Sequence, residues 1–224
     1  MPQSTLNPIL KKRFNRAIEL ALELHRRQVR KRAIVHRGNR AASEVPYFSH
    51  LMIVAGTVLD YGGTEEEASA ALLHDSVEDQ GGLPTLQRIR KSLGPEVARI
   101  VQGCTDSMQT DETRKEAWKL RKTRYLRHLE GADESVLLVS FADKLHNCRA
   151  ALRGLRREGE SFWLRFNAGK AEQLWYYRAL ADVARRRGKG TRAEELVNDF
   201  AHCVAELDKR RRANGGRPAE QAKR

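Results

Sequence analysis

Residues 70–79 read AALLHDSVED, and this stretch places four ionisable side chains inside an apolar segment. Its leucines and valine are typical of a buried helix, where charge is costly unless it is paired or binds a cation. If the segment is one helix, His74 and Glu78 lie one turn apart on one face, and Asp75 and Asp79 lie beside them. One helix can then offer two ligands and two outer carboxylates to a single metal-bound water.

Two other apolar segments carry residues of matching chemistry. Residues 139–147 read VSFADKLHN, in which Asp143 is followed one helical turn later by the amide of Asn147. Residues 46–50 read PYFSH and place His50 at the opening of another apolar run. A lone His-Asp pair more often caps a helix, but two imidazoles and two carboxylates suit Mn²⁺, Fe²⁺ or Zn²⁺ in a site open to water.

The composition indicates one globular domain. A chain of 224 residues is long enough for one well-buried core and short for two. Hydrophobic residues make up 40% and charged residues 32%, and no apolar run approaches the roughly 20 residues of a membrane span. The chain opens without an apolar signal core, and its three cysteines form no CxxC pair, so we expect a cytoplasmic protein with reduced thiols that does not associate with membranes.

The net charge of +13 is concentrated in two segments. Residues 208–224 carry a net +5 and include Gly-Gly-Arg-Pro, so we expect a disordered basic tail after one folded domain over 1–207. Residues 26–40 hold seven Lys and Arg and no acid. Such a cluster binds nucleic acid, solvates a surface or attracts a phosphorylated substrate. We weigh solvation and substrate attraction equally and do not expect nucleic acid.

Helix signals punctuate the whole chain, and sustained strand-like alternation is absent. A capping box at Thr64–Glu67 and the pair Gly94-Pro95 mark helix starts, although 135–141 is also compatible with a short buried strand. We predict an all-α, single-domain bundle of about eight or nine helices. Residues 32–44 and 105–113 are irregular and flank the predicted site, either as substrate loops or as tolerant surface.

The chain resembles the HD-superfamily phosphohydrolases. More narrowly, it resembles the hydrolase domain of the RelA/SpoT-homologue family in its stand-alone form, the small alarmone hydrolase. The similarity runs from about Leu20 to Arg187. It is carried by four blocks in order, HRRQVRK (25–31), PYFSH (46–50), ALLHDSVED (71–79) and ADKLHN (142–147). The resemblance implies an HD-type bundle that hydrolyses the 3′-pyrophosphate of ppGpp or pppGpp with a metal-bound water, giving GDP or GTP and pyrophosphate.

The resemblance also implies roles for individual residues. Four of them are implied to hold the metal, most often Mn²⁺: His50, His74, Asp75 and Asp143. The pair Glu78 and Asp79 is implied to position and deprotonate the attacking water. Substrate contact is implied for Arg30 and Lys31 in the first block and for Asn147 in the last block. For Lys170, which lies at a later turn, we weigh substrate contact and surface charge equally.

The chain departs from the family pattern at residues 104–108. Many members carry a lysine soon after a Val-Thr-Asp turn, whereas residues 104–108 read CTDSM. Another basic side chain must then neutralise the charge of the substrate phosphates. We consider three residues for this role: Arg121, Lys122 and Lys170. Within the last block, we expect Lys144 to form a salt bridge with Glu78 or Asp79, and His146 to be structural.

Two other functions stay open. The same chemistry on another phosphorylated nucleotide, such as ppApp, pppApp or the 2′-phosphate of NADPH, fits the metal motif equally well, because that motif does not select the base. A non-enzymatic RNA-associated helical protein would require a lost ligand or a lost acidic pair. Neither loss is visible in the sequence.

Overall fold

The computed structural model describes residues 10–30, 45–109 and 116–214. The helices in these ranges are α1 (Lys12–His25), α2 (Phe48–Asp60), α3 (Glu65–Leu73), α4 (Ser76–Gln80), α5 (Gly82–Leu93), α6 (Pro95–Cys104), α7 (Trp118–Glu130), α8 (Glu134–Glu158), the 3₁₀ helix η2 (Gly159–Arg165), α9 (Gly169–Gly188) and α10 (Glu194–Asn214). Within the described ranges, the only β pairing is a single bridge between Val29 and Pro46. The all-α prediction is confirmed, and the segment 135–141 is helical.

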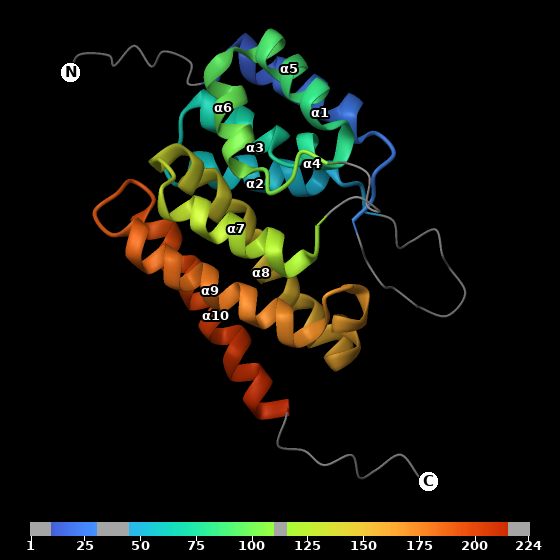
Figure 1. Cartoon of the computed structure of the whole chain (residues 1–224), viewed down its shortest axis with the longest axis vertical. Coiled ribbons are helices and arrows are strands. Elements are labelled where there is room, and N and C mark those ends of the chain that lie inside the picture. The colour runs from blue at the N-terminus through green and yellow to red at the C-terminus, as the bar shows by residue number, and fades with distance from the viewer. Residues whose placement is uncertain (1–9, 31–44, 110–115, 215–224) are drawn as a thin grey trace, which may run out of the picture.

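The helices form an elongated bundle. Figure 1 shows α1 to α6 at one end and α9 and α10 at the other, with α7 and α8 between them. Within the described ranges, no helix has both the length and the apolar character that a membrane crossing requires. Helix α10 continues through residue 214, and residues 215–224 of the expected tail lie outside the described part.

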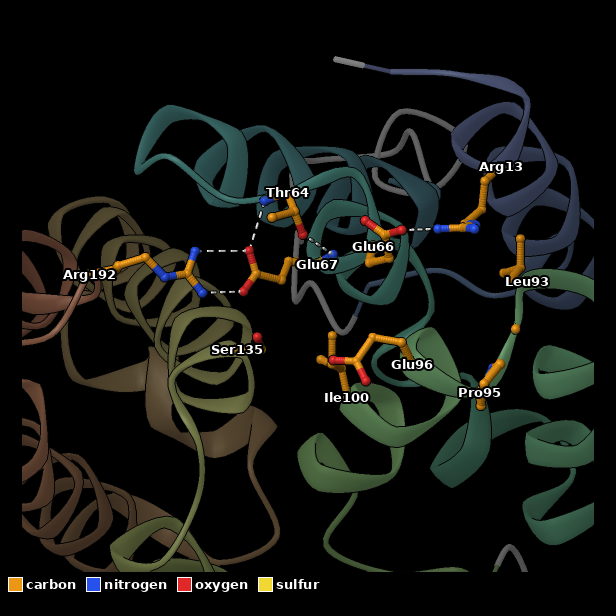
Figure 2. A pocket seen from close by; sticks show the side chains of 11 residues that line it. Arg13, Thr64, Glu66, Glu67, Leu93, Pro95, Glu96, Ile100, Ser135 and Arg192 are labelled. Atoms are coloured by element: carbon orange, nitrogen blue, oxygen red, sulfur yellow. Dashed lines mark hydrogen bonds and ion pairs between the residues drawn. The ribbon is translucent and has the colours of Figure 1, made fainter.

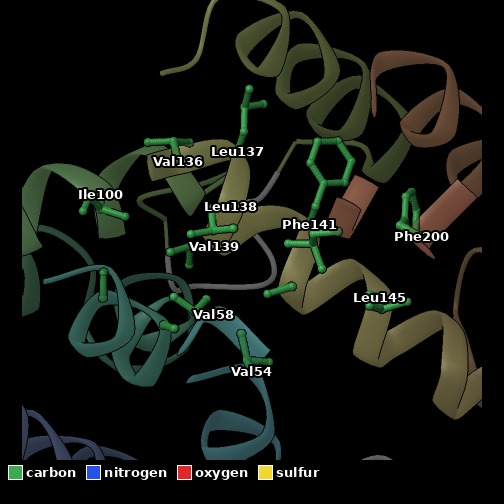
Figure 3. Close-up of a cluster of buried hydrophobic side chains, with 14 of the residues drawn as sticks. Val54, Val58, Ile100, Val136, Leu137, Leu138, Val139, Phe141, Leu145 and Phe200 are labelled. Carbon is green, nitrogen blue, oxygen red and sulfur yellow. The ribbon is translucent and has the colours of Figure 1, made fainter. Parts of the chain in front are cut away.

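Helix α8 is the central element of the core. It packs against α2, α3 and α6 on one side and against α9, α10 and η2 on the other. Figure 3 shows Val139 on the side of Val58 from α2, and Phe141 on the side of Phe200 from α10, where the ring centroids are 5.5 Å apart. Truncating a fully buried side chain such as Leu138 to alanine costs about 2–5 kcal/mol. This packing fixes the register of α8 and therefore the position of its polar residues.

Helix α2 places a histidine in the same core. Its buried residues follow the helical spacing of one face: His50, Leu51, Val54, Ala55 and Val58. The helix ends before Gly62, whose φ of 75° favours glycine. A side chain on the next residue, Gly63, would begin 2.6 Å from the carbonyl oxygen of Val58. The turn therefore requires both glycines and sends the chain back into α3.

The start of α3 is the predicted capping box, and it is also tied to α10. Thr64 Oγ1 accepts a hydrogen bond from the Glu67 backbone, and Glu67 Oε2 accepts one from the Thr64 backbone at 2.7 Å. Arg192, just before α10, donates to both carboxylate oxygens of Glu67, at 2.7 and 3.3 Å. Figure 2 shows this clamp at the edge of a pocket of about 350 Å³. Glu67 is buried, so its charge is stabilised by Arg192 and by the cap.

The predicted continuous helix through 70–79 is interrupted at its centre. Helix α3 ends at Leu73 and α4 begins at Ser76, so His74 and Asp75 form the junction. The Nδ1–H of His74 donates to the carbonyl of Ala71 at 2.8 Å. In a continued α-helix that carbonyl would accept the backbone N–H of residue 75. The side chain competes with the helix for this acceptor, which sequence periodicity does not reveal.

Candidate metal centre

Four side chains from α2, α8 and the α3–α4 junction meet at one point. Nε2 of His50 lies 3.2 Å from Asp143 Oδ1 and 3.6 Å from Asp75 Oδ2. Nε2 of His74 lies 2.9 Å from Asp75 Oδ2 and 3.6 Å from Asp143 Oδ1. Ligand atoms of His50, His74 and Asp75 all lie within 4.8 Å of one another. The structure therefore brings together the four residues that the sequence indicated as metal ligands.

The state of His74 shows that this cluster fits a divalent cation. A carbonyl oxygen only accepts hydrogen bonds, so the contact with Ala71 places a proton on Nδ1 and, in the neutral ring, a lone pair on Nε2. This Nε2 is buried and has no hydrogen-bond partner of suitable geometry among the described residues. A lone pair directed at two carboxylates is repulsive unless a cation or a proton lies between them. Imidazole and carboxylate donors are those that divalent ions of intermediate hardness prefer.

The charges of the cluster are strongly interdependent. Burial lowers the pKa of His74, but Asp75 and Asp143 outweigh it and hold that pKa well above its ordinary value. Burial raises the pKa of Asp143, yet the Lys144 ammonium and the two histidines hold it well below its usual range. The carboxylates therefore stay ionised and attract positive charge into the cluster.

His146 fixes the orientation of His50. The Nδ1 atoms of the two rings are 2.6 Å apart, and Arg30 Nη1 lies 3.2 Å from the same His146 nitrogen. A guanidinium only donates, so His146 Nδ1 is the acceptor and His50 donates its Nδ1–H to it. Burial, with His50 and Arg30 nearby, lowers the pKa of His146 to about 3, so this ring is neutral. The lone pair of His50 is thereby directed through Nε2 at the cluster, as in metal-ligating histidines.

Both oxygens of Asp143 are also held from outside the cluster. Asn147 donates from Nδ2 to Oδ1, and Lys144 donates from Nζ to Oδ2, each at 2.6 Å. The ion pair of Lys144 is thus with its neighbour Asp143, so the expected salt bridge is present, but the expected partner, Glu78 or Asp79, is wrong.

Asp75 has an outer partner in Tyr47, which the sequence analysis did not single out. The hydroxyl of Tyr47 donates to Asp75 Oδ2. Burial first, and then the Asp75 charge, raises the pKa of Tyr47 well above its ordinary value, so the hydroxyl keeps its proton. Backbone hydrogen bonds between residues 28–30 and 45–47 hold Tyr47 beside Arg30.

The two residues of the acidic pair face different partners. Asp79 lines a cleft next to the cluster and accepts a 2.7 Å hydrogen bond from Gln28 Nε2. Glu78 lies toward α7, with Oε1 3.4 Å from Arg121 Nη1. The same guanidinium nitrogen donates to Asp106 at 2.8 Å. Burial, followed by the Asp106 charge, raises the pKa of Glu78 to about 7.

The cleft beside the cluster has a volume of about 450 Å³, which is in the range of small-molecule sites. Its walls combine aromatic rings from α7, η2 and α9 with basic side chains from several helices. Of the predicted substrate residues, Arg30 and Asn147 line it, and Arg30 Nη2 donates to Asn147 Oδ1 at 3.0 Å. Lys31 lies outside the described residues. Lys170 pairs with Glu160 Oε2 at 2.6 Å and is not among the lining residues.

The HD domain family model matches residues 18–172, which is more than half of the chain and contains the whole cluster. The chain belongs to the HD domain family. This HD protein is 39% identical over 123 residues to the GTP pyrophosphokinase rsh of Brucella melitensis, covering 55% of this chain and 16% of that protein. It is 33% identical over 171 residues to a GTP pyrophosphokinase of Streptomyces coelicolor, covering 75% of this chain and 18% of that protein.

A third relative of the HD protein is a probable guanosine-3′,5′-bis(diphosphate) 3′-pyrophosphohydrolase of Synechocystis, 32% identical over 115 residues, or 51% of this chain and 15% of that protein. The chain therefore spans less than a fifth of the length of these relatives. Among solved structures, a metazoan SpoT orthologue that hydrolyses ppGpp matches with a TM-score of 0.63 and 22% identity, covering 90% of this chain and 96% of that chain. A Listeria monocytogenes EGD-e structure matches with a TM-score of 0.59 and 28% identity, covering 71% of this chain and 99% of that chain. These likenesses bear out the HD-type helical fold.

Proposed function

We propose that this protein is a metal-dependent hydrolase that removes the 3′-pyrophosphate of ppGpp or pppGpp, giving GDP or GTP and pyrophosphate. The observation that carries the proposal is the convergence of two buried histidine Nε2 atoms on oxygens of Asp75 and Asp143, 2.9 to 3.6 Å away, beside a cleft of nucleotide size. Relatives of the HD protein whose names concern guanosine polyphosphates supply the substrate class. When bound, a divalent cation, which we propose to be Mn²⁺, supplies Lewis-acid polarisation of the phosphoryl oxygen and activation of water.

The residues around the cluster divide the remaining work. His50, His74, Asp75 and Asp143 hold the cation, with His146, Tyr47 and Lys144 fixing their orientation. Glu78 takes the proton of the attacking water, since a carboxyl whose pKa is near 7 changes protonation state in the working range of a general base. Asp79, held by Gln28 at the cleft wall, positions that water.

The cleft orients the nucleotide. Aromatic faces such as those of Trp118 and Tyr177 offer stacking surfaces to a purine base. Arg30 and Asn147 line the same cleft and are linked to Asp143 through the Asn147 amide, so they can contact the ribose or its 3′ phosphates. Orientation of this kind converts binding energy into rate, because the reacting phosphorus is held in line with the water.

The direct test is hydrolysis by purified protein supplied with Mn²⁺. We expect equimolar GDP and pyrophosphate from ppGpp, resolved by anion-exchange chromatography, and a loss of at least about 10³-fold in His74→Ala and Asp143→Ala. Arg186→Ala, on the exposed face of α9, is the matched control and should keep full activity. Absence of turnover by folded, metal-loaded protein would contradict the proposal. The same assay with ppApp and NADPH tests the alternative nucleotides, because stacking faces accept either purine.

A further inference from the structure

Two lysine ammonium groups line the cleft next to the metal cluster. Lys122 comes from α7 and Lys144 from α8, and their side chains are only 18% and 17% exposed. Lys122 donates to Asp106 at 2.5 Å, and Lys144 donates to Asp143 at 2.6 Å. An ammonium carries three N–H donors, so each lysine retains capacity to donate to an anion in the cleft.

The hydroxyl of Tyr176 is a third polar group at this place. Tyr176 is buried on α9 and lines the same cleft, and its hydroxyl has no hydrogen-bond partner among the described residues. The Lys122 ammonium lies 5.3 Å from the centre of its ring. A buried hydroxyl without a hydrogen-bond partner costs about 1–3 kcal/mol. Binding in the cleft of a group that accepts a hydrogen bond from this hydroxyl is therefore favoured.

The other bases considered for phosphate charge are directed elsewhere. Arg121 donates to Asp106 and contacts Glu78, and it is not among the residues that line the cleft. Lys170 pairs with Glu160 outside the cleft. Of the three bases, the structure leaves Lys122 as the one that lines the cleft.

We propose that Lys122, Lys144 and the Tyr176 hydroxyl form a subsite for the distal phosphate of a 3′-pyrophosphate. The proposal rests on the proposed function. Lys144 directly follows Asp143 and donates to its Oδ2, so an anion held by these groups lies next to the cluster. In the reaction, a bond forms from the water oxygen to the proximal phosphorus, the bond from that phosphorus to ribose O3′ breaks, and O3′ takes a proton. The subsite holds the end of the pyrophosphate that does not react, and it selects a pyrophosphate over a monophosphate.

Binding of inorganic pyrophosphate and inorganic phosphate, measured by calorimetry on Mn²⁺-loaded protein, tests the subsite without turnover. Lys122→Met should weaken pyrophosphate binding about 10- to 100-fold, and Tyr176→Phe about 3- to 10-fold, since these are the values of one charged and one neutral hydrogen bond. Phosphate binding should change less than about 2-fold in either variant. Lys119→Met removes the same charge from the exposed face of α7 and should leave both affinities unchanged.

Kinetics give the second readout. Lys122→Met should lower kcat/KM for ppGpp by the same factor as pyrophosphate affinity, and should lower it little for the analogue with a 3′-monophosphate. Equal losses on both substrates, or unchanged pyrophosphate affinity in Lys122→Met and Tyr176→Phe, would overturn the subsite. Tyr176→Phe, which removes one oxygen atom, decides the matter if Lys122→Met does not fold.

The two proposals fail in different ways. Pyrophosphate binding that depends on Lys122 in a protein that hydrolyses no alarmone would support the subsite and refute the proposed function. Alarmone hydrolysis that is insensitive to both substitutions would refute the subsite alone.

Discussion

His146 accepts the Nδ1–H of His50 across 2.6 Å, and the planes of the two rings are inclined by 22° with centroids 4.8 Å apart. The contact joins α8 to α2 and determines which nitrogen of His50 is available to a cation. His146 is therefore a positioning residue for a proposed metal ligand, and it is held in turn by Arg30, which lines the cleft.

Replacing His146 should weaken metal binding without removing a ligand. We expect His146→Ala to lower Mn²⁺ affinity about 10- to 100-fold, because the His50 ring loses the acceptor that fixes its tautomer and orientation. Titration followed by the Mn²⁺ electron paramagnetic resonance signal measures this affinity. His202→Ala, on the exposed side of α10, is the control and should bind as the native protein does. Native affinity in His146→Ala would show that the contact is incidental.

Glu78 should make the metal-free protein less stable as the pH rises. Its pKa is about 7 in the folded state against an ordinary value of 4.5, so the folded protein binds more protons between these values. Stability contributed by this group is complete below about pH 4.5 and is lost as the pH rises through 7. Compared with Glu78→Gln, the native chain in a chelator should lose about 1–3 kcal/mol of unfolding free energy between pH 5 and 8. Urea midpoints measured across this pH range test the prediction. It is contradicted if the midpoint changes with pH in the same way in both proteins.

The clamp between Glu67 and Arg192 should carry a large share of the stability at the α3–α10 contact. We expect Glu67→Ala to lower the unfolding free energy by about 1–3 kcal/mol, since it removes the cap and the ion pair of a buried carboxylate, while the exposed guanidinium of Arg192 keeps Glu134 as its partner. Urea denaturation provides the measurement. Arg186→Ala breaks an exposed ion pair with Glu130 and should change stability by no more than about 0.5 kcal/mol. Equal effects of the two substitutions would mean that burial of Glu67 has no energetic weight.

Lys170 and Arg30 should differ in their effect on catalysis. Lys170 is paired with Glu160 away from the cleft, so Lys170→Met should change kcat/KM for ppGpp less than about 2-fold. Arg30→Met removes contacts with both His146 and Asn147 at the cleft wall and should reduce it at least about 10-fold. Steady-state kinetics of the two variants decide between them, and a large loss in Lys170→Met would restore its predicted substrate contact.

Local signals in the sequence accounted for most of the fold. The capping box at Thr64 and the Gly94-Pro95 helix start depend on neighbouring residues alone, and both are present in the structure. The break at His74 was not predicted, because it depends on a side chain that takes the Ala71 carbonyl from the helix. Periodicity of apolar residues carries no information about that competition.

The residues that form the cluster could be predicted, whereas their supports could not. The cluster residues are visible because an acid or a histidine in an apolar run is unusual. Tyr47 was quoted within its block, but its role depends on its contact with Asp75 at the α3–α4 junction. His146 follows Asp143 by three residues, a spacing that shares a helix face, and this signal was available. Its partner His50 lies far away in the sequence and becomes its neighbour only when α2 packs on α8.

The central claim is that one divalent ion is shared by His50, His74, Asp75 and Asp143. Anomalous diffraction at the manganese edge from crystals grown with Mn²⁺ tests it most directly. The account predicts one strong peak within about 2.3 Å of the two Nε2 atoms and of an oxygen of each aspartate. A cluster without a peak, or a peak bound by other residues, would contradict it.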